Sequence, residues 1–292
     1  MIVVSVLNIV LDPLLMFDVV PYVTFFGHPI KGFNMGVYGA ALATVISSTV
    51  AFLLAFWILL TGKTYIKIRL KGLLRLDREI DKKLMTIGLP NGLEGFNRNI
   101  ANFLLFKMIA FYGTNFLAAY GIALRLLDLC FMPMMGLNMG GSTIIGQNLG
   151  NGDLNRARKT VHATVRLGVI SLIIINILVF FFSDQLMNIF IHDEAVIKTG
   201  SQILKLIMPA MIFLAIMFGF GTAFSGSGYN KPFLYASIAS RWLVLLPIAF
   251  YTTYVLKTGY VGLLAAYIIS EFVDMLIIAF FYKRGTWETM RV

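Results

Sequence analysis

Long apolar runs dominate this chain, and short polar or charged stretches separate them. The runs lie near residues 2–17, 35–60, 85–111, 116–148, 164–182, 203–224, 233–256 and 259–282. A helix that crosses a bilayer needs about 20 apolar residues, whereas a strand of a membrane β-barrel shows only ~10 residues of alternating character. The pattern therefore predicts an all-α integral membrane protein with about eight transmembrane helices.

Composition agrees with this class. Hydrophobic residues make up 59% of the 292 positions and charged residues 13%, whereas about a quarter of a typical soluble domain is charged. The remaining polar surface is too small to cover a water-soluble globule. The single cysteine, Cys130, excludes an intrachain disulfide framework.

Basic residues are distributed unevenly among the connecting segments. If the first span runs outward from the cytoplasm, sixteen Lys and Arg residues fall on the inner side and four on the outer side. Cytoplasmic loops carry such an excess, so we expect a multi-pass protein of the cytoplasmic membrane with its C-terminus inside. The net charge of +10 would suggest nucleic acid as the partner of a soluble protein. Here the lipid bilayer explains it, and we expect no nucleic-acid partner.

Two parts of the chain resemble each other and suggest an internal repeat. Residues 36–47 and 259–270 both begin with a Gly-x-x-Gly motif and end with serine, and each follows a span that contains a proline. The second copy closes a set of six spans, the third to the eighth. If the first copy also closed a set of six, the first four spans of that set are missing from this chain. Parallel repeats of this kind build transporters. The repeat predicts the C-terminal part of a longer protein or a natural remnant of one, unless shared small-residue motifs of membrane helices explain it.

Asp12 is the strongest candidate for a functional residue within a span, because an ionisable group in a membrane is costly. Asn8 lies one helical turn earlier, so both side chains share a face. Pro13 can free a backbone carbonyl, and Thr44 in the second span could add a hydroxyl. These oxygens could bind Na⁺, or the carboxylate could bind a proton. The alternative is a structural aspartate at a helix kink.

Other charged residues within spans fall into groups with helical spacing. They are Glu94 with Arg98, Arg125 with Asp128, and Glu271 with Asp274, for which Arg241 on the neighbouring span could be a partner. Residues three or four apart pair along a helix, so we expect the first two pairs to be mainly structural. Glu94, Arg98 and Asp128 also form a candidate polar site in the C-terminal half.

A group of methionines surrounds Pro133 in the fourth span. Met132, Met135 and Met139 could contact varied apolar cargo, because thioether side chains are soft and adaptable. The alternative is that they fill the core or face lipid.

No motif in the sequence indicates an enzyme. The three histidines, His28, His162 and His192, have no metal-ligand spacing, and no phosphate-binding loop is present. We therefore expect no metal beyond Na⁺ at Asp12, no ATP, and an ion gradient as the energy source.

Several short motifs together resemble the multidrug and toxic compound extrusion (MATE) family. They are LNIVLDP at 7–13, GVYGAALAT at 36–44, IGLP at 87–90, AYGIA at 119–123, GQNLG at 146–150 with Arg156 and Ala157, Gly226 and Gly228 with Pro232, and RGTW at 284–287. Each motif is modest alone, but their order and spacing over nearly the whole chain are specific.

The resemblance implies a fold and a domain organisation. MATE proteins have twelve helices in two six-helix lobes, and this chain would carry helices five to twelve. The last two helices of the N-terminal lobe would occupy residues 1–62, a basic cytoplasmic inter-lobe loop 63–84, and the six-helix C-terminal lobe 85–292.

The resemblance also implies a cation site. In one branch of the family an acid–amide pair on helix five and a threonine on helix six bind the cation, and Asp12, Asn8 and Thr44 match those positions. The aspartate that this branch uses on helix one has no counterpart here. In another branch a glutamate on helix seven binds Na⁺, and that position is Arg98 in this chain, with Glu94 one turn earlier.

By this resemblance, the expected function is cation-coupled antiport. The protein would export drugs or other xenobiotic organic cations in exchange for H⁺ or Na⁺, without a cofactor beyond the coupling ion, and would be a monomer when full length. One alternative is a flippase for lipid-linked oligosaccharides or polysaccharides, which needs many central basic residues. Only Arg98, Lys107, Arg125 and Arg241 are available. Another alternative is a non-transporting membrane remnant.

Overall fold

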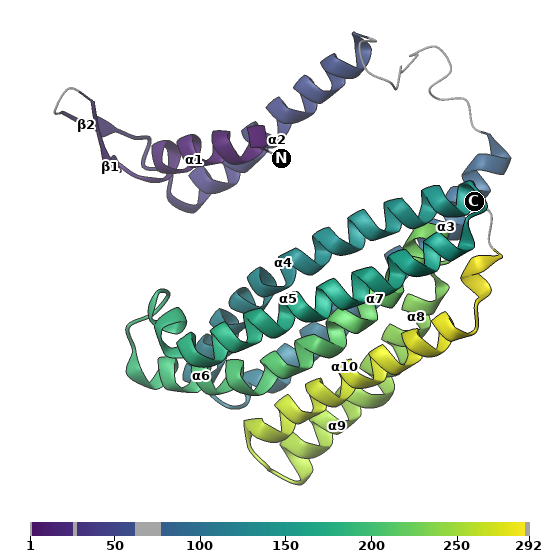
Figure 1. Ribbon diagram of the computed structural model, residues 1–292. Coiled ribbons are helices and arrows are strands. Elements are labelled where there is room, and N and C mark those ends of the chain that lie inside the picture. Colours follow the sequence, from purple (N-terminus) through teal and green to yellow (C-terminus); the bar gives the residue numbers. More distant parts are fainter. Residues whose placement is uncertain (1, 26–27, 62–76, 290–292) are drawn as a thin grey trace. The chain divides into compact units, whose positions relative to one another are not determined.

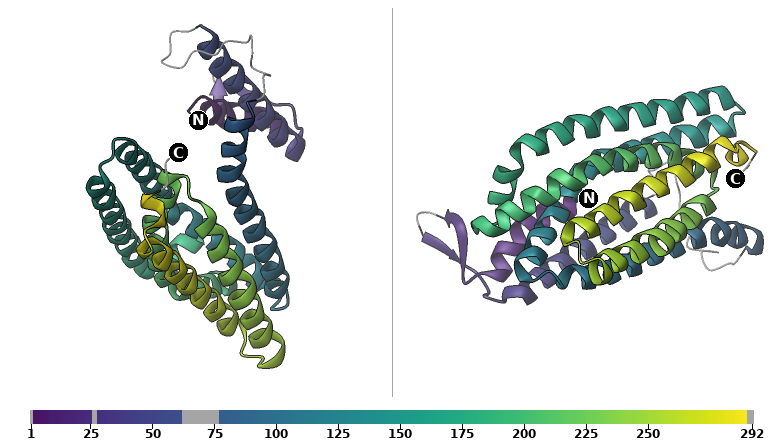
Figure 2. Two further views of the ribbon diagram at one scale, coloured as in Figure 1. Left: turned by 90° about the vertical axis from the view of Figure 1, so that its right-hand side faces the viewer. Right: turned by 90° about the horizontal axis from the view of Figure 1, so that it is seen from below.

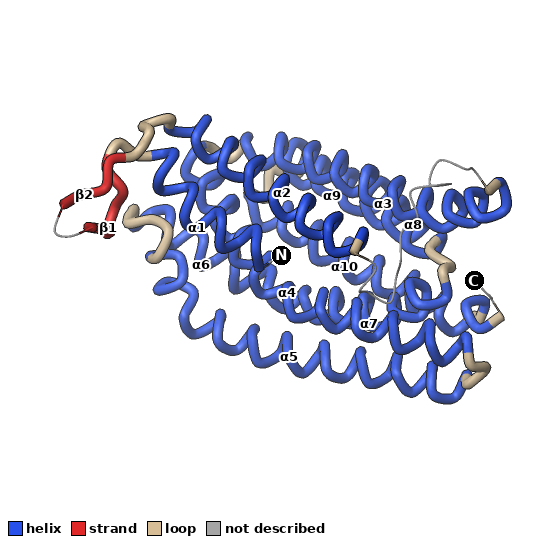
Figure 3. Tube along the Cα trace, turned by 90° about the horizontal axis from the view of Figure 1, so that it is seen from above, coloured by secondary structure: helices blue, strands red, loops and turns tan. Residues whose placement is uncertain are grey.

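The computed structural model describes residues 2–25, 28–61 and 77–289. The chain separates into two compact units, Met1–Asp77 and Arg78–Val292, which are called the N-terminal and the C-terminal unit below. Most of the inter-lobe loop predicted at 63–84 lies outside the described residues. Helices dominate both units, as Figure 3 shows in blue.

The N-terminal unit consists of two helices and a hairpin between them. Its elements are α1 (Ile2–Met16), β1 (Val19–Phe25), β2 (His28–Lys31) and α2 (Gly36–Leu60), labelled in Figure 1. The strands pair antiparallel, with Val19 opposite Lys31 and an irregular register before Thr24. The pattern of apolar runs predicted only a connecting stretch between residues 17 and 35, so the hairpin was not anticipated. The segment contains Val, Tyr, Thr and Phe, which favour strands, and Pro21, which removes a ladder hydrogen bond.

Small residues bring α1 and α2 together. Gly39, Ala43 and Ser47 form the buried stripe of α2, four residues apart on one face. A Cβ atom on Gly39 would lie 2.5 Å from the Leu15 carbonyl oxygen, so only glycine permits this approach. Packing through small residues is the usual way in which membrane helices approach closely.

The C-terminal unit is a helical bundle (Figure 2). Its elements are α3 (Arg78–Ala110), α4 (Thr114–Gly150), α5 (Leu154–Asn188), α6 (Glu194–Ile207), η1 (Met208–Ala210), α7 (Met211–Ser227), α8 (Lys231–Ile238), η2 (Ala239–Leu245), α9 (Leu246–Phe250), η3 (Tyr251–Val255), α10 (Tyr260–Lys283) and η4 (Thr286–Glu288). Helices α4, α5 and α7 pack against one another, and α10 packs on α7 and on the α8–α9 segment. Gly219 of α7 makes one of these approaches possible, because its Cβ would lie 2.6 Å from Val165 of α5.

The eight apolar runs all fall in helices. Within the described ranges, six helices are long and apolar enough to cross a membrane, two of them continuous across short elements: Glu194–Ser227 and Lys231–Val255. The first run forms a shorter apolar helix, Val3–Met16. Helix α3 is long but carries charged residues along its length. It begins at Arg78, so residues 78–84 are helical rather than loop. Glu79 and Asp81 in its first turn stabilise this start.

Two π-helical segments, η2 and η3, lie on either side of α9. Pro247 cannot donate a backbone hydrogen bond, and the amide of Leu246 donates to the carbonyl of Arg241, five residues earlier. The hydroxyl of Ser270 on α10 donates to the carbonyl of Ser240 at 3.0 Å. These bonds fix the wide turn that carries Arg241.

Candidate functional site

Asn8 and Asp12 lie one turn apart on α1, and both side chains are half-buried. The Oδ1 atoms of both residues are buried and have no hydrogen-bond partner in the described part of the chain. Pro13 is the next residue after Asp12. Because proline has no backbone N–H, the carbonyl of Ile9 lacks its usual helical hydrogen-bond donor. The sequence prediction that Asp12 and Asn8 share one face is therefore met, and both present oxygen atoms that no other described residue satisfies.

Thr44 is placed differently from its predicted partners. It is exposed on α2, and its hydroxyl donates to the carbonyl of Ala40 at 3.0 Å. The buried hydroxyl of α2 belongs to Ser47, whose Oγ also lacks a partner among the residues described. Sequence reasoning missed Ser47, although its place in the stripe with Gly39 and Ala43 could have indicated it. The cation-binding role of Asp12, Asn8 and Thr44 stays a prediction.

A second polar cluster lies in the C-terminal unit. Arg98 Nε donates to Glu94 Oε1 at 2.7 Å, and its Nη2 donates to Asp274 Oδ2 at 3.2 Å. Arg241 Nη2 donates to Glu271 Oε1 at 2.6 Å. We call Glu94, Arg98, Arg241, Glu271 and Asp274 the charge network. The predicted pairs Glu94–Arg98 and Arg241–Glu271 are confirmed, whereas the link from Arg98 to Asp274 was missed because 176 residues separate the two.

The deep end of the charge network is almost sealed from solvent. Arg241 is 3% exposed, Glu271 2% and Asp274 0%. The ring of Tyr267 lies 5.6 Å from the Arg241 guanidinium and covers it. Glu94 and Arg98, in contrast, are partly exposed. The network therefore runs from an accessible end on α3 to a buried end on η2 and α10.

Two hydrogen bonds hold α3 at this network. Asn97 donates to the Ser237 hydroxyl at 3.1 Å, and the Trp242 indole donates to Asn97 Oδ1. Because Asn97 precedes Arg98, these bonds fix the segment of α3 that presents the guanidinium to Asp274.

Asp128 does not join the predicted polar site with Glu94 and Arg98. Within the described ranges, no ion pair links it to Arg125, so the pairing expected from their spacing is wrong. A separation of three residues permits contact along a helix but does not require it.

The methionines expected to contact cargo lie on the exposed face of α4. Met132, Met135 and Met139 are exposed, whereas Met134 is buried in the core of the bundle. The structure places the three on one surface of the C-terminal unit and leaves their role as a prediction.

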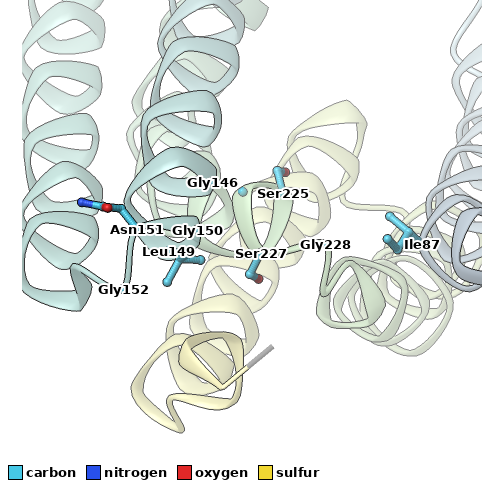
Figure 4. A pocket seen from close by; sticks show the side chains of 10 residues that line it. Ile87, Gly146, Leu149, Gly150, Asn151, Gly152, Ser225, Ser227 and Gly228 are labelled. Carbon is cyan, nitrogen blue, oxygen red and sulfur yellow. The ribbon is translucent and has the colours of Figure 1, made fainter. Parts of the chain in front are cut away.

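A cavity of about 710 Å³ opens at the ends of α4 and α7 (Figure 4). Glycine and serine residues line most of it, and Ile87 of α3 lies at its far side. The lining residues are Ile87, Gly146, Leu149, Gly150, Asn151, Gly152, Ser225, Gly226, Ser227 and Gly228. None of the residues predicted for the site is among them. Among the residues described, no group of three or more His, Cys, Asp or Glu side chains could hold a metal ion.

Comparison with known proteins gives consistent matches. The sequence pattern of the MatE family matches residues 90–251. The chain is 26% identical over 290 residues to the probable multidrug resistance protein NorM of Thermotoga maritima, covering 98% of this chain and 59% of that protein. It is 24% identical over 294 residues to the probable multidrug resistance protein YoeA of Bacillus subtilis, covering 100% and 61%. The chain thus spans about three fifths of the length of these curated relatives.

Solved structures show the same fold. A MOP superfamily transporter from Pyrococcus furiosus superposes with a TM-score of 0.84 at 21% identity, covering 97% of this chain and 60% of that one. The outward-facing structure of a multidrug resistance MATE family transporter superposes with a TM-score of 0.83 at 21% identity, with the same coverage.

Proposed function

Because the chain belongs to the MatE family, we propose that it acts as, or within, a cation-coupled antiporter that exports drugs or other organic cations across the cytoplasmic membrane. The names of the relatives, multidrug resistance and export proteins, support the cargo class. The observation that supports ion coupling is the pair of buried oxygens of Asn8 and Asp12, on an apolar helix, that have no partner among the residues the structure describes.

Asp12 is the ion-coupling residue in this proposal. A carboxylate oxygen that is buried without a partner, as Oδ1 of Asp12 is among the described residues, is costly unless the group gains a cation or a proton. Asn8 Oδ1 offers a second oxygen ligand on the same face, and oxygen ligands suit hard cations such as Na⁺. Binding of H⁺ or Na⁺ would neutralise Asp12, and its release would restore the charge. The outward movement of an organic cation would then be coupled to the inward movement of H⁺ or Na⁺.

Two of the basic residues that a flippase would need are neutralised. Arg98 and Arg241 both form ion pairs with carboxylates of the C-terminal unit. Of the four basic residues within the predicted spans, this leaves Lys107 and Arg125 for a polyanionic lipid-linked sugar, so drug export is the better-supported function.

The test compares Asp12→Asn with the wild-type chain in sealed vesicles. Efflux of a fluorescent organic cation is measured under an imposed pH or Na⁺ gradient, and the matching substitution is measured in a full-length relative. We expect at least a tenfold loss of gradient-driven efflux with normal membrane insertion. Asp184→Asn, an exposed acid on α5, serves as the matched control.

Undiminished efflux by Asp12→Asn would remove Asp12 from the mechanism. A wild-type chain that inserts but moves no cation, while the relative does, would identify the chain as a non-transporting part.

A further inference from the structure

A groove of about 220 Å³ lies between α5 and the junction of α6 with η1, in the C-terminal unit. Its α5 wall includes Asn176, Ile177 and Phe180, and its other wall includes Lys205 and Met208. Apart from Lys205 and Asn176, the side chains that line it are apolar. The groove therefore combines an apolar floor with a single charged side chain.

Lys205 has no counter-charge in the described part of the chain. Its ammonium lies 5.9 Å from the centroid of the Phe180 ring, which positions the charge but does not neutralise it. Among the residues described, no carboxylate forms an ion pair with it, including Asp184, which lies one turn beyond Phe180 on α5. The lysine is half-buried, so its stem is packed while its charge needs a partner.

The polar groups of the groove are ordered by depth. α5 ends at Asn188 and α6 begins at Glu194, so depth on both walls is counted from the same end of the unit, where Figure 1 labels α6. Counted in this way, Asn176 and Met208 lie about one turn deeper than Phe180 and Lys205. The apolar run predicted at 164–182 also ends beside Phe180. Lys205 can therefore place its ammonium at the edge of the bilayer, with its stem along the apolar wall.

Asn176 supplies a hydrogen-bond donor at the deeper level. Its Nδ2 donates to the carbonyl of Leu172 at 2.7 Å, and an amide group carries two such hydrogens. The second hydrogen remains for an acceptor in the groove. From the edge of the bilayer inward, the groove thus offers a cation, an amide donor and an apolar floor. A phospholipid presents a phosphate, an ester carbonyl and an acyl chain in the same order.

We propose that this groove binds one anionic phospholipid. The phosphate lies against Lys205, an ester carbonyl accepts from Asn176, and one acyl chain packs on Ile177 and Met208. An anionic headgroup is favoured over a zwitterionic one, because only the former brings a net negative charge to the unpaired lysine. The site belongs to the C-terminal unit alone, and its occupancy does not depend on the proposed antiport.

Native mass spectrometry of lipid adducts tests the proposal. The purified 292-residue chain in detergent is titrated with phosphatidylglycerol or with phosphatidylcholine of the same acyl chains. We expect one phosphatidylglycerol to bind more tightly than phosphatidylcholine. Lys205→Gln should weaken phosphatidylglycerol by about fivefold, the effect of one basic residue near an anionic lipid, and leave phosphatidylcholine unchanged. Lys205→Arg should retain the preference.

Lys198→Gln is the matched control, because Lys198 is an exposed lysine of the same helix that does not line the groove. A second variant, Ile177→Trp, fills the floor but keeps the charge, and it should weaken phosphatidylglycerol binding; it decides the question if Lys205→Gln does not fold. Equal affinities of the wild-type chain for the two lipids would overturn the proposal. So would equal losses in Lys205→Gln and Lys198→Gln, or an unchanged affinity in Ile177→Trp. Displacement of the lipid by glycerol 3-phosphate would also overturn it, because the site would then recognise a soluble phosphate without an acyl chain.

Discussion

The crossing of α5 and α7 should depend on the absence of a side chain at Gly219. An alanine Cβ there would lie 2.6 Å from Val165 Cγ2 and 2.8 Å from Val165 Cα. The second atom is backbone, so a rotamer change cannot relieve the overlap and the helices must separate. Overpacking of this kind costs about 1–3 kcal/mol. Alanine also favours a helix interior over glycine by about 1 kcal/mol, and this gain opposes the loss.

Gly136→Ala removes the ambiguity, because it isolates the helix-propensity gain. Gly136 also lies inside a helix, α4, but a Cβ there meets nothing within 4 Å. The two alanine variants should therefore differ by about 1–3 kcal/mol, with Gly219→Ala the less stable. At roughly 2–4 °C per kcal/mol for a unit of this size, their melting midpoints should differ by several degrees. The assay is thermal unfolding of the detergent-purified chain, followed by tryptophan fluorescence. Equal midpoints would show that α5 and α7 do not approach at Gly219 as described.

Two further expectations concern the charge network and the orientation of the chain. Arg241→Met should destabilise the chain by about 3–5 kcal/mol, because Glu271 would lose its buried partner. In the same thermal assay Arg158→Met, at an exposed ion pair, should leave the midpoint nearly unchanged, and equal effects of the two substitutions would contradict the burial argument. A reporter fused after the last residue should be fluorescent if it is green fluorescent protein and inactive if it is alkaline phosphatase, since the positive-inside rule places the C-terminus in the cytoplasm. The opposite pattern would reverse the predicted orientation.

Hydrophobic patterning was enough to predict the helices, because the solvent for this fold is lipid. Each apolar run corresponds to a helix, and the ends are where prediction failed. Helix α5 begins at Leu154, well before the run predicted at 164–182. The carboxylate of Asp153 caps it by accepting from the amide of Arg156 at 2.9 Å. Residues 154–163 are rich in charge, and such residues can form the part of a helix that extends beyond the bilayer. Hydropathy alone cannot detect this part of α5.

Local spacing predicted some polar contacts and failed for others. Glu94 and Arg98 pair because one turn of α3 brings them together, whereas Arg125 and Asp128 have similar spacing and do not pair. The partner of Asp274 depends on how α3 and α10 pack, and no local pattern encodes that. Ser47 was missed for a similar reason, since its importance comes from the face of α2 that meets α1.

The π-helical segments η2 and η3, on either side of α9, set the directions of two polar contacts that the segment Lys231–Val255 makes with neighbouring helices. Arg241 reaches Glu271 near the middle of the segment Lys231–Val255, and Thr253 accepts a hydrogen bond from the Tyr112 hydroxyl at 3.0 Å near its end. Each residue of a regular helix turns the chain by about 100°. Tightening either π turn into regular winding would swing one contact out of line while the other stayed in place. The angle between these two contacts therefore depends on the extra residue that each π-helical segment adds per turn.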